Sequence, residues 1–268
     1  MPRQNVTAVV NRSRMYAASR QQEILRFLDQ ATSVSVTDLA THFAVSKASI
    51  RRDLRSLRKL GMLQRTYGGA VKPVVSSNEA SFNERHVFRY DEKLRIGEQA
   101  TRLIQPEMTV FIDGGTTAEC MIPYLSDKTL TVVTYGLNII TRLAGAEQVT
   151  VISIGGTLNH RTQTFGGVLA FDSIQAYNMR FDIAFIACSA VSADSGATNA
   201  SFEDIPMKRK AIQAAQWAIL IADSSKIGCV AAGMVAPVNK FERLITGQAA
   251  PADEVKKLRE LGVKVDLV

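Results

Sequence analysis

Apolar residues in the first quarter of the chain recur every three or four positions in three short segments, residues 20–31, 37–43 and 46–60. This spacing places the apolar side chains on one face of a helix, so each segment is predicted to be helical. The third helix has Ser46 as a favourable N-cap and Gly61 as a C-terminal stop. Its apolar residues form one stripe, Ile50, Leu54, Leu57 and Leu60.

A two-residue turn, Ala44-Val45, separates the second of these helices from the third. Three helices with a tight turn between the last two form a helix-turn-helix. Residues 62–71, which contain Gly68 and Gly69, are predicted to form a small β-hairpin with a glycine tip. The first part of the chain is therefore predicted to be a winged helix-turn-helix domain.

From residue 82 onward the pattern changes to short, almost wholly apolar runs that alternate with helical periodicity. Such an alternation is typical of a mostly parallel sheet covered on both faces. The predicted strands are 108–113, 130–134, 149–154, 181–187, 217–223, 242–246 and 263–267, and the predicted helices are 91–104, 116–125, 137–143, 207–216 and 252–261. The fold class is α/β, with the winged helix-turn-helix domain at 17–73 and a larger, doubly wound domain at 82–268.

Basic residues are concentrated in the first part of the chain. Residues 1–72 hold 13 Lys and Arg against 4 Asp and Glu, a net charge of +9, whereas the remainder holds 19 against 21, a net charge of −2. This distribution is typical of a nucleic-acid-binding domain attached to a neutral globular domain.

The basic residues of segment 46–60 fall mostly off its apolar stripe. For this helix alone, a solvated basic surface is an equally good explanation. In a helix-turn-helix, however, the second helix of the pair enters the major groove with its N-terminal end first. The candidates for DNA contact on this helix and on the wing are Ser46, Lys47, Ser49, Arg51, Arg52, Arg55, Arg65 and Tyr67.

Glycines and small polar residues follow several predicted strands of the larger domain. Open α/β sheets bind ligands at the carboxyl ends of their strands, where glycines permit close approach and free helix N–H groups attract anions. The candidates are Asp113, Gly114, Gly115, Thr116, Thr117, Thr134, Tyr135, Gly155, Gly156, Lys208, Asp223 and Lys226. They suit a phosphorylated polyol, with the phosphate at the helix N-terminus and lysine, and the hydroxyls at Asp113 and Asp223. The alternative is that these residues only form strand-to-helix turns.

Cys120, Cys188 and Cys229 are widely separated and odd in number, without a C-x-x-C pair. They favour a reducing compartment and predict neither a disulfide nor a zinc site, so no metal is expected. The sequence has no G-x-G-x-x-G motif and no Walker motif, so no cofactor is expected either. Residues 1–19 are polar with several arginines, unlike a signal peptide, and no apolar run approaches the length of a membrane span. A cytoplasmic location is expected.

The helix and wing motifs resemble the DNA-binding domain of the DeoR family of bacterial repressors. The resemblance covers roughly residues 20–73 and is carried by Val45-Ser46, Ser49-Ile50-Arg51-Arg52-Asp53-Leu54, Leu57, Gly61, Arg65 and Gly68-Gly69-Ala70. It joins a helix signature to a wing signature at the right distance. The family usually has His where this chain has Tyr67, which implies one altered backbone contact.

The larger domain also resembles the sensor domain of the DeoR family, so the resemblance spans nearly the whole chain. The matching residues are 113–117, Val132-Val133-Thr134, Gly155-Gly156, 182–186, Asp204 with Lys208, and Asp223-Ser224-Ser225-Lys226. The resemblance implies a sugar-phosphate-sensing fold related to ribose-5-phosphate isomerases and sugar-phosphate deaminases, with Asp204 as a further effector-binding residue. The chain departs from the family pattern at Tyr135, where Asn is usual, at Asp204, where Glu is common, at Ala190, where Gly is frequent, and at Ile245-Thr246-Gly247, which lacks an Asp. Together these departures imply a less common effector or a bulkier pocket wall at Tyr135.

These features predict a sequence-specific DNA-binding transcriptional regulator, a repressor of carbohydrate catabolism genes controlled by a phosphorylated sugar or polyol. The alternative is a sugar-phosphate isomerase or deaminase with a DNA-binding appendage, because Asp113, Asp204, Lys208 and Lys226 are potential acid–base groups. A purely architectural DNA-binding protein would leave the larger domain unexplained. The expected partners are operator DNA, the effector and further copies of the chain, because each recognition helix covers only a few base pairs.

Overall fold

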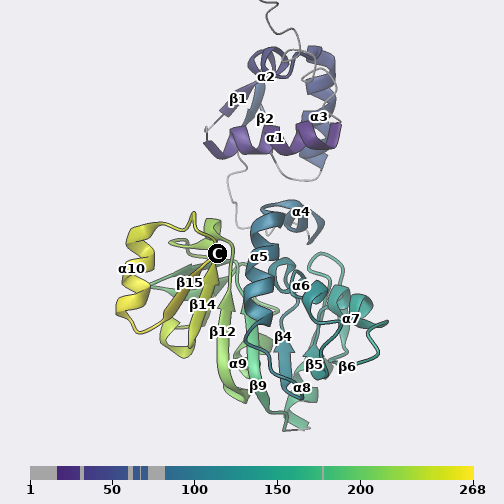
Figure 1. Ribbon diagram of the computed structural model, residues 1–268, viewed down its shortest axis with the longest axis vertical. Coiled ribbons are helices and arrows are strands. Elements are labelled where there is room, and N and C mark those ends of the chain that lie inside the picture. Colours follow the sequence, from purple (N-terminus) through teal and green to yellow (C-terminus); the bar gives the residue numbers. More distant parts are fainter. Residues whose placement is uncertain (1–16, 31–32, 60–62, 67, 72–81, 177) are drawn as a thin grey trace, which may run out of the picture. The chain divides into compact units, whose positions relative to one another are not determined.

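The structure is a computed structural model that describes residues 17–30, 33–59, 63–66, 68–71, 82–176 and 178–268 (Figure 1). The chain divides into two compact units, Met1–Ser76 and Ser77–Val268, which we call the N-terminal and C-terminal units.

Within the described residues, the N-terminal unit consists of three helices and a small antiparallel sheet. The helices are α1 (Ala17–Gln30), α2 (Val36–His42) and α3 (Lys47–Lys59). The sheet has the order β1-β3-β2, with strands β1 (Ser33–Ser35), β2 (Gln64–Arg65) and β3 (Gly69–Val71). The predicted winged helix-turn-helix is confirmed. Strand β1 is an addition, because three residues are too few to give a periodic signal.

Local interactions make α3 begin where the sequence predicts. The Ser46 hydroxyl accepts a hydrogen bond from the backbone N–H of Ser49 at 3.1 Å, which confirms the N-cap. Ala44, in the turn before α3, has a φ of 51°, so it adopts the left-handed conformation that reverses the chain sharply. The predicted stop at Gly61 and the last apolar position, Leu60, lie outside the described residues.

An ion pair at the edge of the N-terminal core joins α1 to α3. Asp53 of α3 is buried, and its Oδ2 lies 2.6 Å from Nε of Arg20 on α1. Its Oδ1 accepts a hydrogen bond from the Gln21 side chain at 3.3 Å. Because Ile50 and Leu54 are fully buried beside it, this carboxylate fixes the position of α3 within the core.

Asp53→Ala is expected to destabilise the N-terminal unit by about 3 kcal/mol, because it removes the carboxylate that pairs with Arg20 in a largely buried position. A unit of this size has a total stability of only about 3–5 kcal/mol, so operator binding should be lost as well. Thermal unfolding of the full chain measures the loss. The double variant Arg20→Met/Asp53→Leu is the control, since removing both charges should recover part of it. An unshifted transition in Asp53→Ala would contradict this role.

The C-terminal unit is built on a seven-stranded parallel sheet with the order β15-β14-β12-β9-β4-β5-β6 (Figure 1). The strands are β4 (Thr109–Ile112), β5 (Leu130–Thr134), β6 (Val149–Ser153), β9 (Phe181–Ala187), β12 (Ala215–Ile221), β14 (Arg243–Thr246) and β15 (Lys264–Leu267). Each lies within two residues of its prediction. Long apolar runs identify these strands because both faces of a covered sheet are buried.

Helices cover both faces of this sheet and enclose two hydrophobic cores (Figure 1). The first core includes residues of α5 (Tyr90–Thr101), α6 (Thr116–Glu119) and α7 (Leu137–Leu143), and the second those of α8 (Val168–Ala176), α9 (Ile205–Ala214) and α10 (Ala252–Glu260). The predicted doubly wound α/β architecture is confirmed. Among the described residues, no helix is both long enough and apolar enough to span a membrane.

Several short elements are additions to the prediction. They are α4 (Phe82–Val87), α8, the hairpin of β7 (Thr157–Asn159) and β8 (Thr164–Gly166), and a small antiparallel sheet of β10 (Ala190–Ser192), β11 (Gly196–Asn199) and β13 (Gly233–Ala236). Most are too short for apolar periodicity to distinguish them from loops.

Three predicted helices have different ends. The helix expected at 116–125 is the single turn α6 followed by a 3-10 helix at Ile122–Tyr124, because Pro123 lacks the N–H that would continue an α-helix. The helix expected at 207–216 starts two residues earlier as α9 and ends where β12 begins. Helix α5 follows Arg89, which has a φ of 53°, so Asp91 is not its N-cap.

Candidate functional site

The predicted DNA-contact residues of α3 lie away from the core of the N-terminal unit. Those that are exposed are Ser46, Lys47, Arg51, Arg52 and Arg55, and Ser49 is half-buried. The opposite face of the helix is buried, so α3 presents a cationic surface suited to DNA phosphates and base edges. The side chain of Arg65 and the whole of Tyr67 lie outside the described residues.

The C-terminal sheet changes winding direction between β4 and β9. Beyond β4 lie β5 and β6, and beyond β9 lie β12, β14 and β15. At such a switch point the strand-to-helix connections leave in opposite directions, and ligands bind in the crevice outside the carboxyl ends of the strands. Asp113 directly follows β4 here, and Ala187 is the last residue of β9.

Asp113 is the centre of a buried network at this switch point, with no exposed surface. Its Oδ1 accepts hydrogen bonds from the Gly114 N–H at 2.8 Å and from the Tyr135 hydroxyl. Its Oδ2 accepts from the Ala187 N–H at 2.8 Å and from the Lys208 ammonium, which also donates to the Ala187 carbonyl at 3.0 Å. Four internal donors satisfy the carboxylate, so a ligand hydroxyl would have to replace one of them.

The charges of this network are set by burial and by neighbouring carboxylates. Burial opposes the Lys208 ammonium, but Asp113 and Asp204 raise its pKa above the ordinary lysine value. Burial and Asp113 raise the pKa of Tyr135 well above its usual range, so its hydroxyl remains a donor. Asp204 joins the group through its Oδ1, which accepts from the Thr164 hydroxyl at 3.3 Å. The network is therefore a charged and largely buried anchor.

A second cluster lies where α5 meets α4 and α6. Lys93 of α5 is only 2% exposed, and its ammonium donates to the Arg85 carbonyl of α4 and to the Thr116 hydroxyl of α6, the latter at 3.1 Å. Burial lowers the pKa of Lys93 to about 8, although Asp223 acts in the opposite direction.

The loop after β12 supplies two charged groups, Asp223 and Lys226, that act on Lys93. Asp223 is 1% exposed, and its Oδ2 lies 3.9 Å from Nζ of Lys226, which donates to the Cys188 carbonyl at 2.8 Å. Burial favours the neutral acid, but Lys226 and Lys93 lower the pKa of Asp223. Arg89 donates to the Ser224 hydroxyl at 2.7 Å, which ties the start of α5 to this loop.

The structure brings most of the predicted effector residues into these two clusters and leaves others outside them. Thr134 accepts the Gly136 N–H at 3.1 Å and so shapes the turn after β5. Gly155 and Gly156 are exposed. Gly156 has a φ of 133°, and a Cβ there would lie 2.4 Å from the Gly166 carbonyl oxygen. The packing of the β7–β8 hairpin is therefore sufficient to require a glycine at this position, without any role in ligand binding.

Sequence reasoning missed the contribution of α5. A signal was available, since Lys93 shares a helical stripe with Ile96, Gly97 and Ala100, and a lysine within an apolar stripe indicates a buried ammonium. The close approach of α5 to the chain after α6 depends on this stripe, because a Cβ at Gly97 would lie 2.2 Å from the Cys120 carbonyl oxygen.

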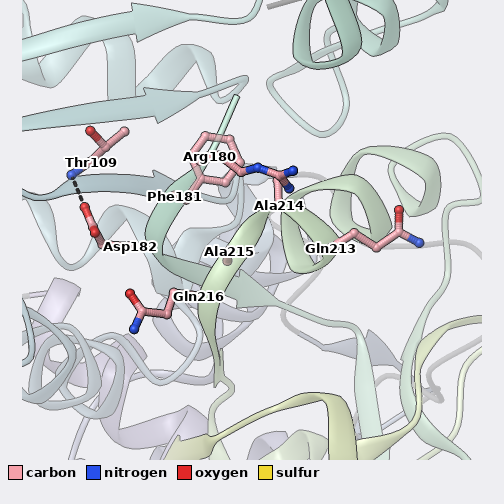
Figure 2. Close-up of a pocket in the computed structure, with 8 residues that line it drawn as sticks. All are labelled: Thr109, Arg180, Phe181, Asp182, Gln213, Ala214, Ala215 and Gln216. Atoms are coloured by element: carbon pink, nitrogen blue, oxygen red, sulfur yellow. Dashed lines mark hydrogen bonds between the residues drawn. The ribbon is translucent and has the colours of Figure 1, made fainter. Parts of the chain in front are cut away.

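A hollow at the opposite edge of the sheet has different chemistry. It has a volume of about 370 Å³ and lies at the amino ends of β4, β9 and β12, lined by Thr109, Arg180, Phe181, Asp182, Gln213, Ala214, Ala215 and Gln216 (Figure 2). Figure 2 shows the Asp182 carboxylate directed at the Thr109 backbone N–H, which donates to it at 2.8 Å. This carboxylate joins two strands, whereas the lysine clusters lie at the carboxyl edge. We therefore take the carboxyl edge as the candidate effector site.

Two family models match the chain. The DeoR-like helix-turn-helix domain matches residues 20–74, and the DeoR C-terminal sensor domain matches residues 89–248. Together they cover both units, which confirms the resemblance inferred from the motifs.

The names of two similar proteins agree with this assignment. The uncharacterized HTH-type transcriptional regulator YulB of Bacillus subtilis is 32% identical over 95% of this chain and 98% of its own. The glycerol-3-phosphate regulon repressor of Escherichia coli K12 is 28% identical over 94% of this chain and 100% of its own. The ribose 5-phosphate isomerase A structure from Methanocaldococcus jannaschii covers 52% of this chain and 54% of its own, at 16% identity and a TM-score of 0.38. The chain belongs to the DeoR family of transcriptional regulators.

Proposed function

We propose that this DNA-binding regulator represses carbohydrate catabolism genes. We further propose that a phosphorylated sugar or polyol binds at the carboxyl edge of the seven-stranded sheet and controls the affinity of the protein for its operator. The observation that carries the effector class is the group of lysines at this edge. Lys93 and Lys226 lie near one carboxylate, Asp223, whereas Lys208 lies near two, Asp113 and Asp204. The cluster of Lys93, Lys226 and Asp223 therefore has one more cation than carboxylate, which suits a phosphate monoester.

The lysines, rather than a helix dipole, are the main source of attraction for the phosphate in this proposal. Helix α6 has only one turn, so few of its peptide dipoles are aligned. Within α6, the Thr117 hydroxyl is buried and has no hydrogen-bond partner among the described residues. Gly115 is half-buried and allows the backbone to be approached. The similar repressor from E. coli is named for glycerol 3-phosphate, a phosphorylated polyol, which supports the same class.

We further propose that binding is not followed by chemical turnover and needs no cofactor. A sugar-phosphate isomerase or deaminase must remove a proton with a free general base. At this edge the Asp113 carboxylate accepts four hydrogen bonds, one of them from the Lys208 ammonium, so it is engaged by internal donors and is not free. Incubation with each panel compound described below, followed by product analysis, tests this point. Isomerised or deaminated product would favour the enzyme alternative.

The effector class is tested by thermal shift of the full chain against glycerol 3-phosphate, ribose 5-phosphate, inorganic phosphate and the unphosphorylated glycerol and ribose. A binding phosphate at one hundred times its Kd should stabilise the C-terminal unit by about 2.7 kcal/mol. The same compounds should change the affinity for an operator selected from random DNA with the wild-type protein. Equal stabilisation by the unphosphorylated parents, or none by any phosphate, would overturn the effector proposal.

We also propose that the chain acts in the cytoplasm as a homo-oligomer. The C-terminal unit would supply most of the contacts between the chains. One α3 helix reads only a few base pairs, so a specific operator needs at least two half-sites spaced by whole helical turns. Light scattering of the full chain, with and without operator, should give a mass of two or more chains. A monomeric mass in both conditions would contradict the oligomer.

A further inference from the structure

Helix α4 is the first element after residues 72–81, which join the two units, and it is attached to the effector edge by three contacts. The Phe82 N–H donates to the Arg161 carbonyl at 2.9 Å at its start. His86 Nδ1 lies 2.9 Å from a carboxylate oxygen of Glu119, at the end of α6. Between them, the Arg85 carbonyl accepts from the Lys93 ammonium. The start of the C-terminal unit is thus held by one residue of the site, Lys93, together with Arg161 and Glu119.

The Lys93 ammonium has a donor to spare within the described part of the chain. A lysine ammonium carries three N–H donors, and here it has two acceptors, the Arg85 carbonyl and the Thr116 hydroxyl. At 2% exposure, water has little access to this side chain. A buried charged donor without a partner is costly, so an anionic oxygen as a third acceptor would be strongly favourable.

The groups facing Lys93 favour an additional negative charge. From α4 comes Arg85, from the loop after β12 come Asp223 and Lys226, and from the end of α6 comes Cys120. Burial raises the pKa of Cys120 to about 11, so it remains a neutral thiol at neutral pH. Two cations, Arg85 and Lys226, and one carboxylate, Asp223, therefore act on the Lys93 ammonium.

We propose that Lys93 binds the phosphate group of the effector with its third N–H and thereby fixes α4, so that occupancy of the site is transmitted to the linker through the Arg85 carbonyl. This inference rests on the proposed function, because it requires a phosphorylated effector at the carboxyl edge. It adds a ligand from α5, which the predicted set of strand-end residues does not contain.

Effector binding is coupled to α4 through the charge of the Lys93 side chain. Without effector, the Lys93 ammonium is destabilised by burial, and in mildly alkaline solution it loses the positive charge that strengthens its hydrogen bond to the Arg85 carbonyl. With a phosphate beside it, the ammonium is stabilised and donates to the Arg85 carbonyl permanently. A ligand shifts a conformational equilibrium only through such a difference in affinity between two states, here a loose and a fixed α4.

Binding affinity tests Lys93 directly. Isothermal titration with glycerol 3-phosphate, ribose 5-phosphate and inorganic phosphate should show that the affinity of the full wild-type chain falls about tenfold between pH 7 and pH 9 as Lys93 loses its proton, because phosphate monoesters are already dianions above pH 7. Lys93→Met should bind at least about tenfold more weakly at pH 7 and show no such slope. Lys128→Met is the matched control, since the Lys128 ammonium also donates to a carbonyl, of Ile104 at 3.5 Å.

Hydrogen–deuterium exchange tests the coupling to α4. In the wild-type chain, phosphate compounds should slow the exchange of the α4 amides. In Lys93→Met these amides should exchange faster than in the wild type when no compound is present, and adding a compound should not change their exchange rate. The wild-type measurements alone decide the matter if Lys93→Met does not fold. A flat pH profile, or α4 exchange that binding leaves unchanged, would overturn the inference and leave the proposed function standing. Failure of all three compounds to bind the wild-type chain would overturn both.

Discussion

Asp113→Ala is expected to lower the free energy of unfolding of the C-terminal unit by about 3–5 kcal/mol, because it leaves the Lys208 ammonium buried without its carboxylate. The same substitution removes the acceptor of the Tyr135 hydroxyl and of the Ala187 N–H, and so loosens β4 from β9 and from the turn after β5. Chemical denaturation of the full chain measures the loss. The N-terminal unit should unfold as in the wild type.

The two halves of the pair can be separated by double substitution. Asp113→Ala and Lys208→Met should each destabilise strongly, whereas the double variant should lose less than the sum, because neither member of the pair is left buried without the other. Since the pKa of Lys208 is raised above the ordinary lysine value, the stabilisation by the pair is present throughout the neutral range and is lost only as the pH rises through that higher pKa. Additive losses, or a stable Asp113→Ala chain, would show that the pair is not the anchor described above.

The large elements of the fold could be predicted because their signals are local and long. The α3 stripe of Ile50, Leu54 and Leu57 gives a helix, and its Ser46 cap is visible within four residues. The seven strands are apolar almost throughout, and a helix follows most of them. Parallel pairing then brings the carboxyl ends to one edge, which is why strand-end residues such as Asp113 and Asp223 were sound candidates.

The rest depends on tertiary contacts that no local pattern contains. Helix α4 has six residues with mixed charge, and its backbone is held by Lys93, which is adjacent to it only in the folded chain. Asp113 was predicted to bind ligand hydroxyls because it follows a strand, but the four donors that satisfy it come from four different segments. The effector role of each residue remains a prediction for the experiments above.

Arg51→Ala and Arg52→Ala are expected to weaken operator binding by about 1–3 kcal/mol each, roughly 5- to 150-fold in Kd. Both side chains are exposed in the N-terminal half of α3, the half that enters the major groove in a helix-turn-helix. Arg58→Ala is the matched control, since Arg58 is an exposed arginine one to two turns further along the same helix and should contribute less.

Two further measurements on the same variants distinguish an arginine that binds a base from one that binds the DNA backbone. If the arginine binds a guanine through two hydrogen bonds, preference at that base pair should relax and the salt dependence should change little. If it binds phosphate, all DNA sequences should weaken alike and the slope of log K against log salt should fall by about 1. Mobility shifts at several salt concentrations, with the selected operator and with single-base variants, provide both measurements. Wild-type affinity in both variants would show that α3 does not bind the operator through these side chains.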